Sequence, residues 1–89
     1  MRDWALRFSP DAVRDLQKLD RSAYKLAVER VEWLKVHFDS LTPLPLHAEW
    51  GGHYKWRAGD YRIIYTINYS ACILYVEHVR HRDRVYKRK

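Results

Sequence analysis

The stretch that decides the fold is Tyr54-Lys55-Trp56-Arg57-Ala58-Gly59-Asp60-Tyr61-Arg62-Ile63-Ile64-Tyr65. Aromatic side chains alternate with basic ones before Gly59-Asp60, and a period of two resumes after that pair. This period is typical of a strand with one covered face, and a Gly-first pair between two such runs favours a two-residue turn. The sequence therefore predicts an antiparallel hairpin that turns at residues 59 and 60.

The two-residue turn fixes which side chains face each other across the hairpin. It places Arg57 opposite Arg62 and Lys55 opposite Ile64, and cross-strand partners share a face of the sheet. Lys55, Arg57 and Arg62 are therefore expected together on an open face. A three-residue turn would put Arg62 on the opposite face, so this basic cluster depends on the register.

Two arginines that lie directly opposite each other repel. Either an anion between them removes that cost, or the two side chains extend apart into water. The other face of the same strands is mainly aromatic and aliphatic and is expected to pack against helices: Tyr54, Trp56, Tyr61, Ile63, Tyr65 and Ile67.

Two helices are expected before the hairpin. Ser9-Pro10-Asp11 is typical of a helix start, because Ser accepts from a free N–H, Pro fits the first turn and an acid favours the positive end of the dipole. Asp20 is expected to cap a second helix, whose apolar residues recur at spacings of three and four. About one residue separates the two helices, so they are predicted to form an antiparallel hairpin.

The remaining elements complete the predicted fold. Residues 4–8 alternate as a short first strand, residues 43–52 contain most of the Gly and Pro and form a loop, and Cys72 to Val79 forms the last strand. We therefore expect a single domain over residues 1–89 of the α+β class. Its order is β-α-α-β-β-β, with the helical hairpin packed on one face of an antiparallel sheet.

The charge of the chain is divided unevenly between its two halves. Residues 1–50 hold eight basic and eight acidic side chains, whereas residues 51–89 hold nine basic and three acidic ones. Such asymmetry favours a polyanionic partner such as nucleic acid, an acidic protein or a membrane surface.

Composition also excludes several classes of protein. A single cysteine, Cys72, excludes an internal disulfide and a zinc site built from cysteines. The longest uncharged stretch, residues 63–76, is shorter than the roughly 20 apolar residues of a membrane helix, and the N-terminus lacks the apolar core of a signal peptide. A cytoplasmic protein with no membrane partner is expected.

The end of the last strand adds further candidates to the open face. In a meander it neighbours the strand that carries Arg62, so His81, Arg82 and Tyr86 are expected at the same rim. Glu77 is also expected near Arg62, either as a counter-ion or as a partial base. Arginines bind phosphate bidentately, and His, Lys or Tyr moves protons. Such a set is suited to phosphodiester cleavage without a metal.

Two stretches of the chain together resemble the RelE/ParE superfamily of type II toxins: residues 54–65 and the ending Val79-Arg80-His81-Arg82-Asp83-Arg84-Val85-Tyr86. Phe8-Ser9-Pro10 and the helical hairpin match as well, so the resemblance covers nearly the whole chain. It implies a compact toxin of the microbial-ribonuclease-like kind, neutralised by a cognate antitoxin, that contacts operator DNA only through the antitoxin complex.

The RelE branch implies a specific reaction. Messenger RNA is cleaved in the A site of the 70S ribosome, where the 2′-hydroxyl attacks the adjacent phosphate. The products are a 2′,3′-cyclic phosphate and a free 5′-hydroxyl, and neither a metal nor another cofactor takes part.

Carried over position by position, the resemblance assigns roles to five residues. Lys55 and Arg57 match the basic pair before the turn, and Arg62 matches the arginine that clamps the phosphate. Arg82 matches the late arginine, which stabilises the leaving 5′-oxygen or acts as the acid. Tyr86 matches the near-terminal tyrosine, which stacks on a base or, like Lys55, accepts the proton of the 2′-hydroxyl.

The chain departs from the archetype at Arg57, where the archetype has a lysine, because arginine does not act as a base near neutral pH. His81 is the kind of residue that other branches use as acid or base. The acid and the base are therefore open between Lys55, His81, Arg82 and Tyr86. Other basic residues are expected to bind RNA in a salt-dependent way: Arg80, Arg84, Lys87, Arg88 and Lys89.

Other functions are weighed against mRNA cleavage. The i, i+3 spacing of His78 and His81 points the two rings to opposite faces of a strand, which argues against a metal site. A ParE-like inhibitor of DNA gyrase would lack the basic catalytic set. A non-catalytic module that acts only in a repressor complex with its antitoxin on DNA is the third candidate.

Overall fold

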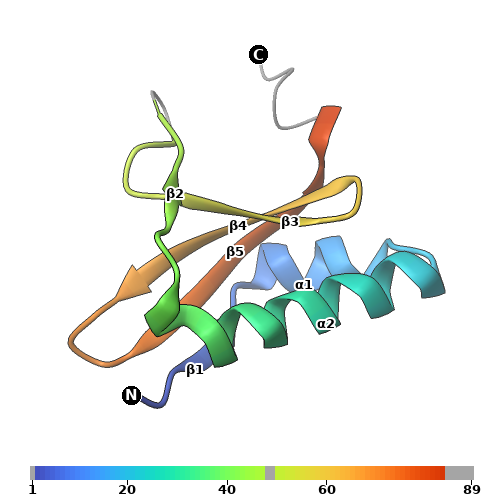
Figure 1. Cartoon of the computed structure of the whole chain (residues 1–89). Helices are drawn as coiled ribbons and strands as arrows, with labels where there is room; N and C mark the ends of the chain where they lie inside the picture. Colours follow the sequence, from blue (N-terminus) through green and yellow to red (C-terminus); the bar gives the residue numbers. More distant parts are fainter. Residues whose placement is uncertain (1, 48–49, 84–89) are drawn as a thin grey trace.

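The computed structural model describes residues 2–47 and 50–83. Along these residues lie β1 (Ala5–Phe8), α1 (Pro10–Gln17), α2 (Arg21–His37), the 3-10 turn η1 (Phe38–Ser40), β2 (Leu44–Pro45), β3 (Tyr54–Ala58), β4 (Tyr61–Asn68) and β5 (Ile73–His81). The strands form a sheet in the order β1-β5-β4-β3-β2, and both helices lie on one side of it (Figure 1). The predicted α+β fold is confirmed.

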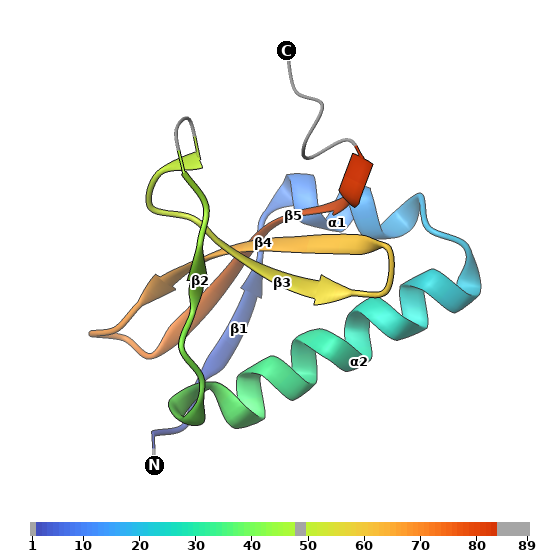
Figure 2. The same cartoon turned by 45° about the horizontal axis from the view of Figure 1, so that its top comes forward.

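The sheet is mixed, so the prediction of a wholly antiparallel sheet is wrong in one strand. β1 runs parallel to β5, with Ala5 paired to Ile73 and Phe8 paired to Val76 (Figure 2). A tight turn fixes the direction of the strand that follows it, but β1 and β5 are joined by no such turn. The sequence also did not predict β2, a two-residue edge strand in which Pro45 is tolerated because it lies at the sheet edge.

The predicted helix caps are confirmed and one of them ties a helix to the sheet. The Ser9 hydroxyl accepts from the Ala12 N–H at 3.0 Å and donates to the Glu77 carbonyl of β5 at 2.7 Å. The Asp20 carboxylate accepts from the Ala23 N–H at 2.8 Å. Each cap satisfies a backbone N–H that the helix itself leaves without an acceptor.

The hairpin between β3 and β4 has the predicted register. Arg57 pairs with Arg62, and Lys55 pairs with Ile64. Gly59 has a φ of 61°, a left-handed conformation that glycine adopts at little cost. The Gly59-Asp60 turn therefore holds Lys55, Arg57 and Arg62 on one face, as predicted.

The hydrophobic core lies between that hairpin and the helices. Ile63 and Tyr65 of β4 are buried on the face that carries α2, where Val31 and Leu34 are also buried. Burial of such side chains contributes roughly 1.5–3 kcal/mol each. The opposite face of β3, β4 and β5, which we call the open face, is not covered by a helix (Figure 1).

Within residues 2–47 and 50–83, no helix combines the length and the hydropathy needed to cross a bilayer.

Candidate nucleic-acid interface

Three arginines stand side by side across the open face. Arg57 of β3 pairs with Arg62 of β4, and Arg62 pairs in turn with Arg80 of β5. Because neighbouring strands lie about 4.8 Å apart, the three backbone positions span about 10 Å. We call these three residues the arginine row. The sequence predicted the pair, and the structure adds Arg80.

The neighbouring set of paired positions on the open face carries a lysine and a histidine. Lys55, Ile64 and His78 lie at successive positions across β3, β4 and β5. Ile64 is fully buried, so neighbouring side chains cover it on the open face. One neighbour is Trp50, whose ring centroid lies 5.5 Å from that of His78. The arginine row is therefore flanked by partly covered Lys55 and His78.

A β-bulge in β5 determines which side chains reach this face. Ile64 pairs with His78, whereas the next residue, Tyr65, pairs with Val76, so Glu77 is the extra residue. Without the bulge, Glu77 would lie opposite Ile64 and every later residue of β5 would switch faces. Glu77 therefore has no partner on β4, and the residue that pairs with Arg62 is Arg80.

The bulge also separates His81 from the arginine row. His81 pairs with Tyr61, whose side chain packs against the helical core, and the two ring centroids lie 5.4 Å apart. The His81 Nδ1 accepts from the Asp83 N–H at 3.3 Å. Because successive residues of a strand point to opposite faces, Arg80 and His81 cannot both reach the open face. The expected position of His81 is corrected accordingly.

The other predicted site residues lie as follows. Lys55 and Arg62 are half-buried, and Arg57 is exposed, with its Nε donating to the Gly59 carbonyl at 3.1 Å. Arg82 is exposed beside the hairpin turn, and its N–H donates to the Asp60 carbonyl at 2.9 Å. Five predicted residues lie outside the described residues: Arg84, Tyr86, Lys87, Arg88 and Lys89.

Sequence reasoning missed two residues that contact Arg80. The Asp15 carboxylate of α1 accepts from the Arg80 Nε at 3.2 Å, and the His78 Nδ1 lies 2.9 Å from the Arg80 Nη2. Burial, together with the nearby Arg80 charge, lowers the pKa of His78 from its ordinary value of 6.5. The His-x-Arg spacing was visible in the sequence, but the approach of Asp15 depends on the tertiary fold.

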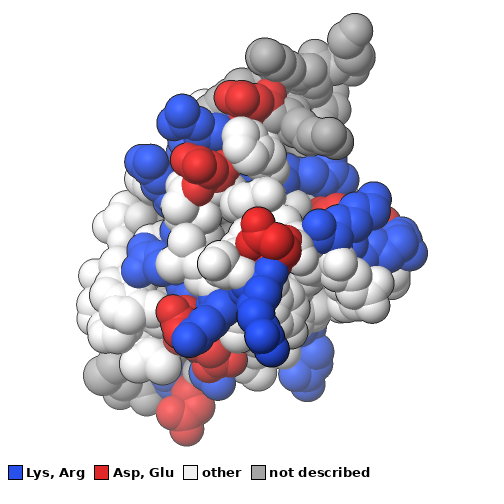
Figure 3. Space-filling view, turned by 90° about the vertical axis from the view of Figure 1, so that its right-hand side faces the viewer, with Lys and Arg blue, Asp and Glu red and all other residues white. Residues whose placement is uncertain are grey.

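A groove adjoins the end of the arginine row. It measures about 450 Å³ and lies between α1 and the end of β5, and its lining includes Lys18, Tyr61, Arg80 and His81. On the side of the molecule that lies at the right of Figure 1, positive and negative side chains are interspersed (Figure 3). The positive charge there is therefore not a uniform coat, and an anion site depends on local arrangements such as the arginine row.

Among the residues that the structure describes, no group of three or more His, Cys, Asp or Glu side chains is placed to hold a metal ion.

Solved structures of toxins share this fold. A chain of the RelBE2 toxin-antitoxin complex from Mycobacterium tuberculosis is 29% identical, with a TM-score of 0.80 over 91% of this chain and 100% of that one. A chain of the archaeal RelE-RelB complex from Pyrococcus horikoshii OT3 is 24% identical, with a TM-score of 0.70 over 93% and 99%. The isolated E. coli RelE toxin is 20% identical, with a TM-score of 0.71 over 93% and 90%.

Comparison of the amino-acid sequence with known protein families identifies the family of this chain. The comparison with curated proteins found no match. The family described as the ParE toxin of type II toxin-antitoxin systems matches residues 6–86, which include both the hairpin and the end of β5. The chain therefore belongs to this family of the RelE/ParE superfamily and is a toxin of a type II toxin-antitoxin system.

Proposed function

We propose that this toxin is a ribosome-dependent endonuclease that cleaves mRNA in the ribosomal A site. The observation that supports this proposal is the arginine row beside Lys55 on the open face. Arginines at three paired positions of neighbouring strands offer many N–H donors to phosphate oxygens, and their charge stabilises the extra negative charge of a five-coordinate phosphorus.

The proposed reaction needs a base, an acid and charge stabilisation. The 2′-oxygen forms a bond to the adjacent phosphorus and gives its proton to Lys55 or to Tyr86. The bond between phosphorus and the 5′-oxygen then breaks, and Arg82 either protonates that oxygen or stabilises it while a proton is taken up from solvent water. Arg62 holds the non-bridging phosphate oxygens. The products are a 2′,3′-cyclic phosphate and a 5′-hydroxyl, so atoms and charges balance without a further reactant.

We propose a cognate antitoxin as the protein partner. RelBE2 was solved as a toxin-antitoxin complex, and the archaeal RelE was solved in complex with RelB. An acidic segment of the antitoxin would neutralise the arginine row and block RNA at the same place. Operator DNA would be contacted only through that complex, and the ribosomal substrate places the activity in the cytoplasm.

Inhibition of DNA gyrase is the second candidate function. The family that matches this chain is described as the ParE toxin of type II toxin-antitoxin systems, and this description favours gyrase inhibition. A gyrase inhibitor acts by binding a protein and has no need of aligned arginines on an open sheet face, so the arginine row favours cleavage.

Two assays with the same purified protein separate the candidates. In a translation system of purified components, mRNA cleavage should yield fragments with 5′-hydroxyl and 2′,3′-cyclic phosphate ends. In a supercoiling assay, gyrase should remain active. Intact mRNA together with inhibited gyrase would contradict the proposal and support the second candidate. Arg82→Ala should abolish cleavage and leave antitoxin binding largely unchanged, and wild-type cleavage by this variant would remove Arg82 from the mechanism.

A further inference from the structure

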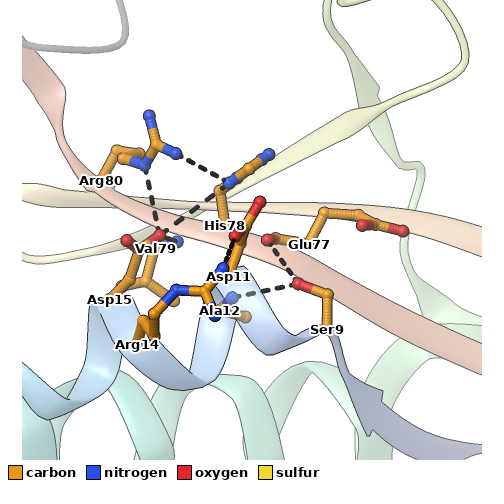
Figure 4. Close-up of polar contacts among 9 residues, drawn as sticks. All are labelled: Ser9, Asp11, Ala12, Arg14, Asp15, Glu77, His78, Val79 and Arg80. Atoms are coloured by element: carbon orange, nitrogen blue, oxygen red, sulfur yellow. Dashed lines mark hydrogen bonds and ion pairs between the residues drawn. The ribbon is translucent and has the colours of Figure 1, made fainter.

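Arg80 is held at two points of its guanidinium group. Its Nε donates to the Asp15 carboxylate at 3.2 Å, and its Nη2 donates to the His78 Nδ1 at 2.9 Å (Figure 4). A guanidinium has five N–H donors, so these two contacts leave three. The side chain is 38% exposed, which leaves part of the group within reach of a ligand.

The two residues that hold Arg80 are themselves fixed. The Asp15 side chain is 15% exposed, and the carboxylate oxygen that accepts from Arg80 also accepts from the Val79 N–H at 2.9 Å. The His78 side chain is 18% exposed and lies against the ring of Trp50. Neither holder can turn away without losing contacts of its own.

The contact also fixes the proton of His78. Because a guanidinium only donates, the His78 Nδ1 must accept, and the proton of the neutral ring lies on Nε2. The lowered pKa of His78 is consistent with that neutral form. The ring thus accepts a hydrogen bond that orients the Arg80 side chain. Asp15 and His78 can therefore both accept from the same guanidinium group.

We propose that Asp15 and His78 are positioning residues that hold Arg80 as a fixed phosphate ligand at the end of the arginine row. The inference rests on the proposed function, because RNA on the open face supplies the phosphate. An arginine that is already immobilised loses less rotamer freedom on binding, and its planar fork matches two phosphate oxygens.

The competing explanation is that the Asp15–Arg80 pair only fastens α1 to β5. Under that explanation Arg80 would not respond to RNA, and changes at His78 would alter stability alone. A measurement on the Arg80 side chain itself therefore separates the two.

The experiment follows the Nε–Hε signal of Arg80 by NMR in the purified, isotope-labelled protein during titration with a trinucleotide. Methylation of every 2′-oxygen of the trinucleotide removes the nucleophile, so binding is observed without cleavage. The signal should shift on titration. The slope of log affinity against log salt should fall by about 0.7 in Arg80→Ala, the value for one lost phosphate contact on a single strand. Arg14→Ala removes an equal charge from exposed α1 and should leave the slope unchanged.

Two variants of His78 test the positioning role. In His78→Asn the amide oxygen takes the place of Nδ1 as acceptor, so affinity should stay within about two-fold of the wild type. In His78→Leu the acceptor is lost, and affinity should fall about five-fold as Arg80 regains rotamer freedom. Equal affinities of the Leu and Asn variants would overturn the role of His78.

The wild-type titration decides the inference even if the Leu variant does not fold. An Arg80 signal that stays fixed while the trinucleotide binds overturns the inference, whether or not the toxin cleaves mRNA. A shifted Arg80 signal from a protein that cleaves no mRNA in translation supports phosphate binding and overturns the proposed function. The two failures are thus distinguishable.

Discussion

Ile64 of β4 lies opposite His78 of β5, and not opposite Glu77 as an unbroken ladder would require. The bulge at Glu77 therefore turns His78 and Arg80 toward the open face and Val79 toward the core, where it is 3% exposed. Bulges commonly re-aim side chains in this way. The presence of Arg80 in the arginine row thus depends on this bulge.

Deletion of Glu77 should keep the arginine row in place. Removal of the extra residue leaves Ile64 opposite His78 and Arg62 opposite Arg80 in an unbroken ladder, so Val79 stays in the core. The free energy of unfolding should fall by only about 1–2 kcal/mol, from the lost hydrogen bond between Ser9 and the Glu77 carbonyl. Thermal unfolding followed by circular dichroism measures the loss, and Glu77→Ala, which keeps the chain length, should unfold near the wild-type temperature. A deletion variant that does not fold would contradict the assignment of Glu77 as the extra residue.

Ser9→Ala should lower the free energy of unfolding by about 2 kcal/mol, because it removes the cap of α1 and the donor to the Glu77 carbonyl. Unfolding by urea measures this change. Ser22→Ala, at an exposed position in the first turn of α2, serves as the control and should change stability by less than about 0.5 kcal/mol. Similar losses in the two variants would show that Ser9 does not join α1 to β5.

Gly59→Ala should cost more stability than Gly52→Ala. Both glycines have positive φ, which costs an alanine roughly 1 kcal/mol, but only at Gly59 would a Cβ meet another atom, 2.8 Å from the Leu26 Cδ2. Urea unfolding should therefore show a loss of about 2 kcal/mol for Gly59→Ala and about 1 kcal/mol for Gly52→Ala. Adding Leu26→Ala should suppress the steric part of the Gly59→Ala loss. No such suppression would mean that the contact is not the cause.

Acidification should destabilise the wild type more than His78→Asn. The pKa of His78 is lowered in the folded protein by burial and by Arg80, although Asp15, Asp11 and Glu77 oppose the shift. As the pH falls through 6.5, the unfolded chain takes up a proton that the folded protein resists, so stability is lost toward the lower folded pKa. Urea titrations between pH 7 and pH 5 measure the difference. Identical pH dependence in the two proteins would rule out this contribution.

Local signals made part of the structure predictable. The period of two around Gly59-Asp60 gave the register of Arg57 and Arg62, because turn type and strand alternation depend only on neighbouring residues. Ser9 and Asp20 were recognisable as helix caps for the same reason. The basic pair of the open face was therefore accessible from sequence.

Tertiary features were not predictable in this way. The direction of β1 depends on its pairing with β5 at the far end of the chain. The bulge at Glu77 left only a change of apolar spacing in the sequence, from two between Leu74 and Val76 to three between Val76 and Val79. Asp15 reads as a surface residue of a short helix, and only the packing of α1 on β5 brings it to Arg80. Consequently, His81 was expected on the wrong face, and the contact between His78 and Arg80 was not predicted.

The proposed function requires that mRNA is cut at the arginine row. Primer extension on a defined mRNA, translated in purified components with added toxin, is the decisive measurement. Wild-type protein and the control Arg14→Ala should produce stops within A-site codons, whereas Arg62→Ala should reduce them by about a hundredfold, as expected for loss of a transition-state donor. Full-length cDNA with the wild type, or wild-type cleavage by Arg62→Ala, would contradict the claim.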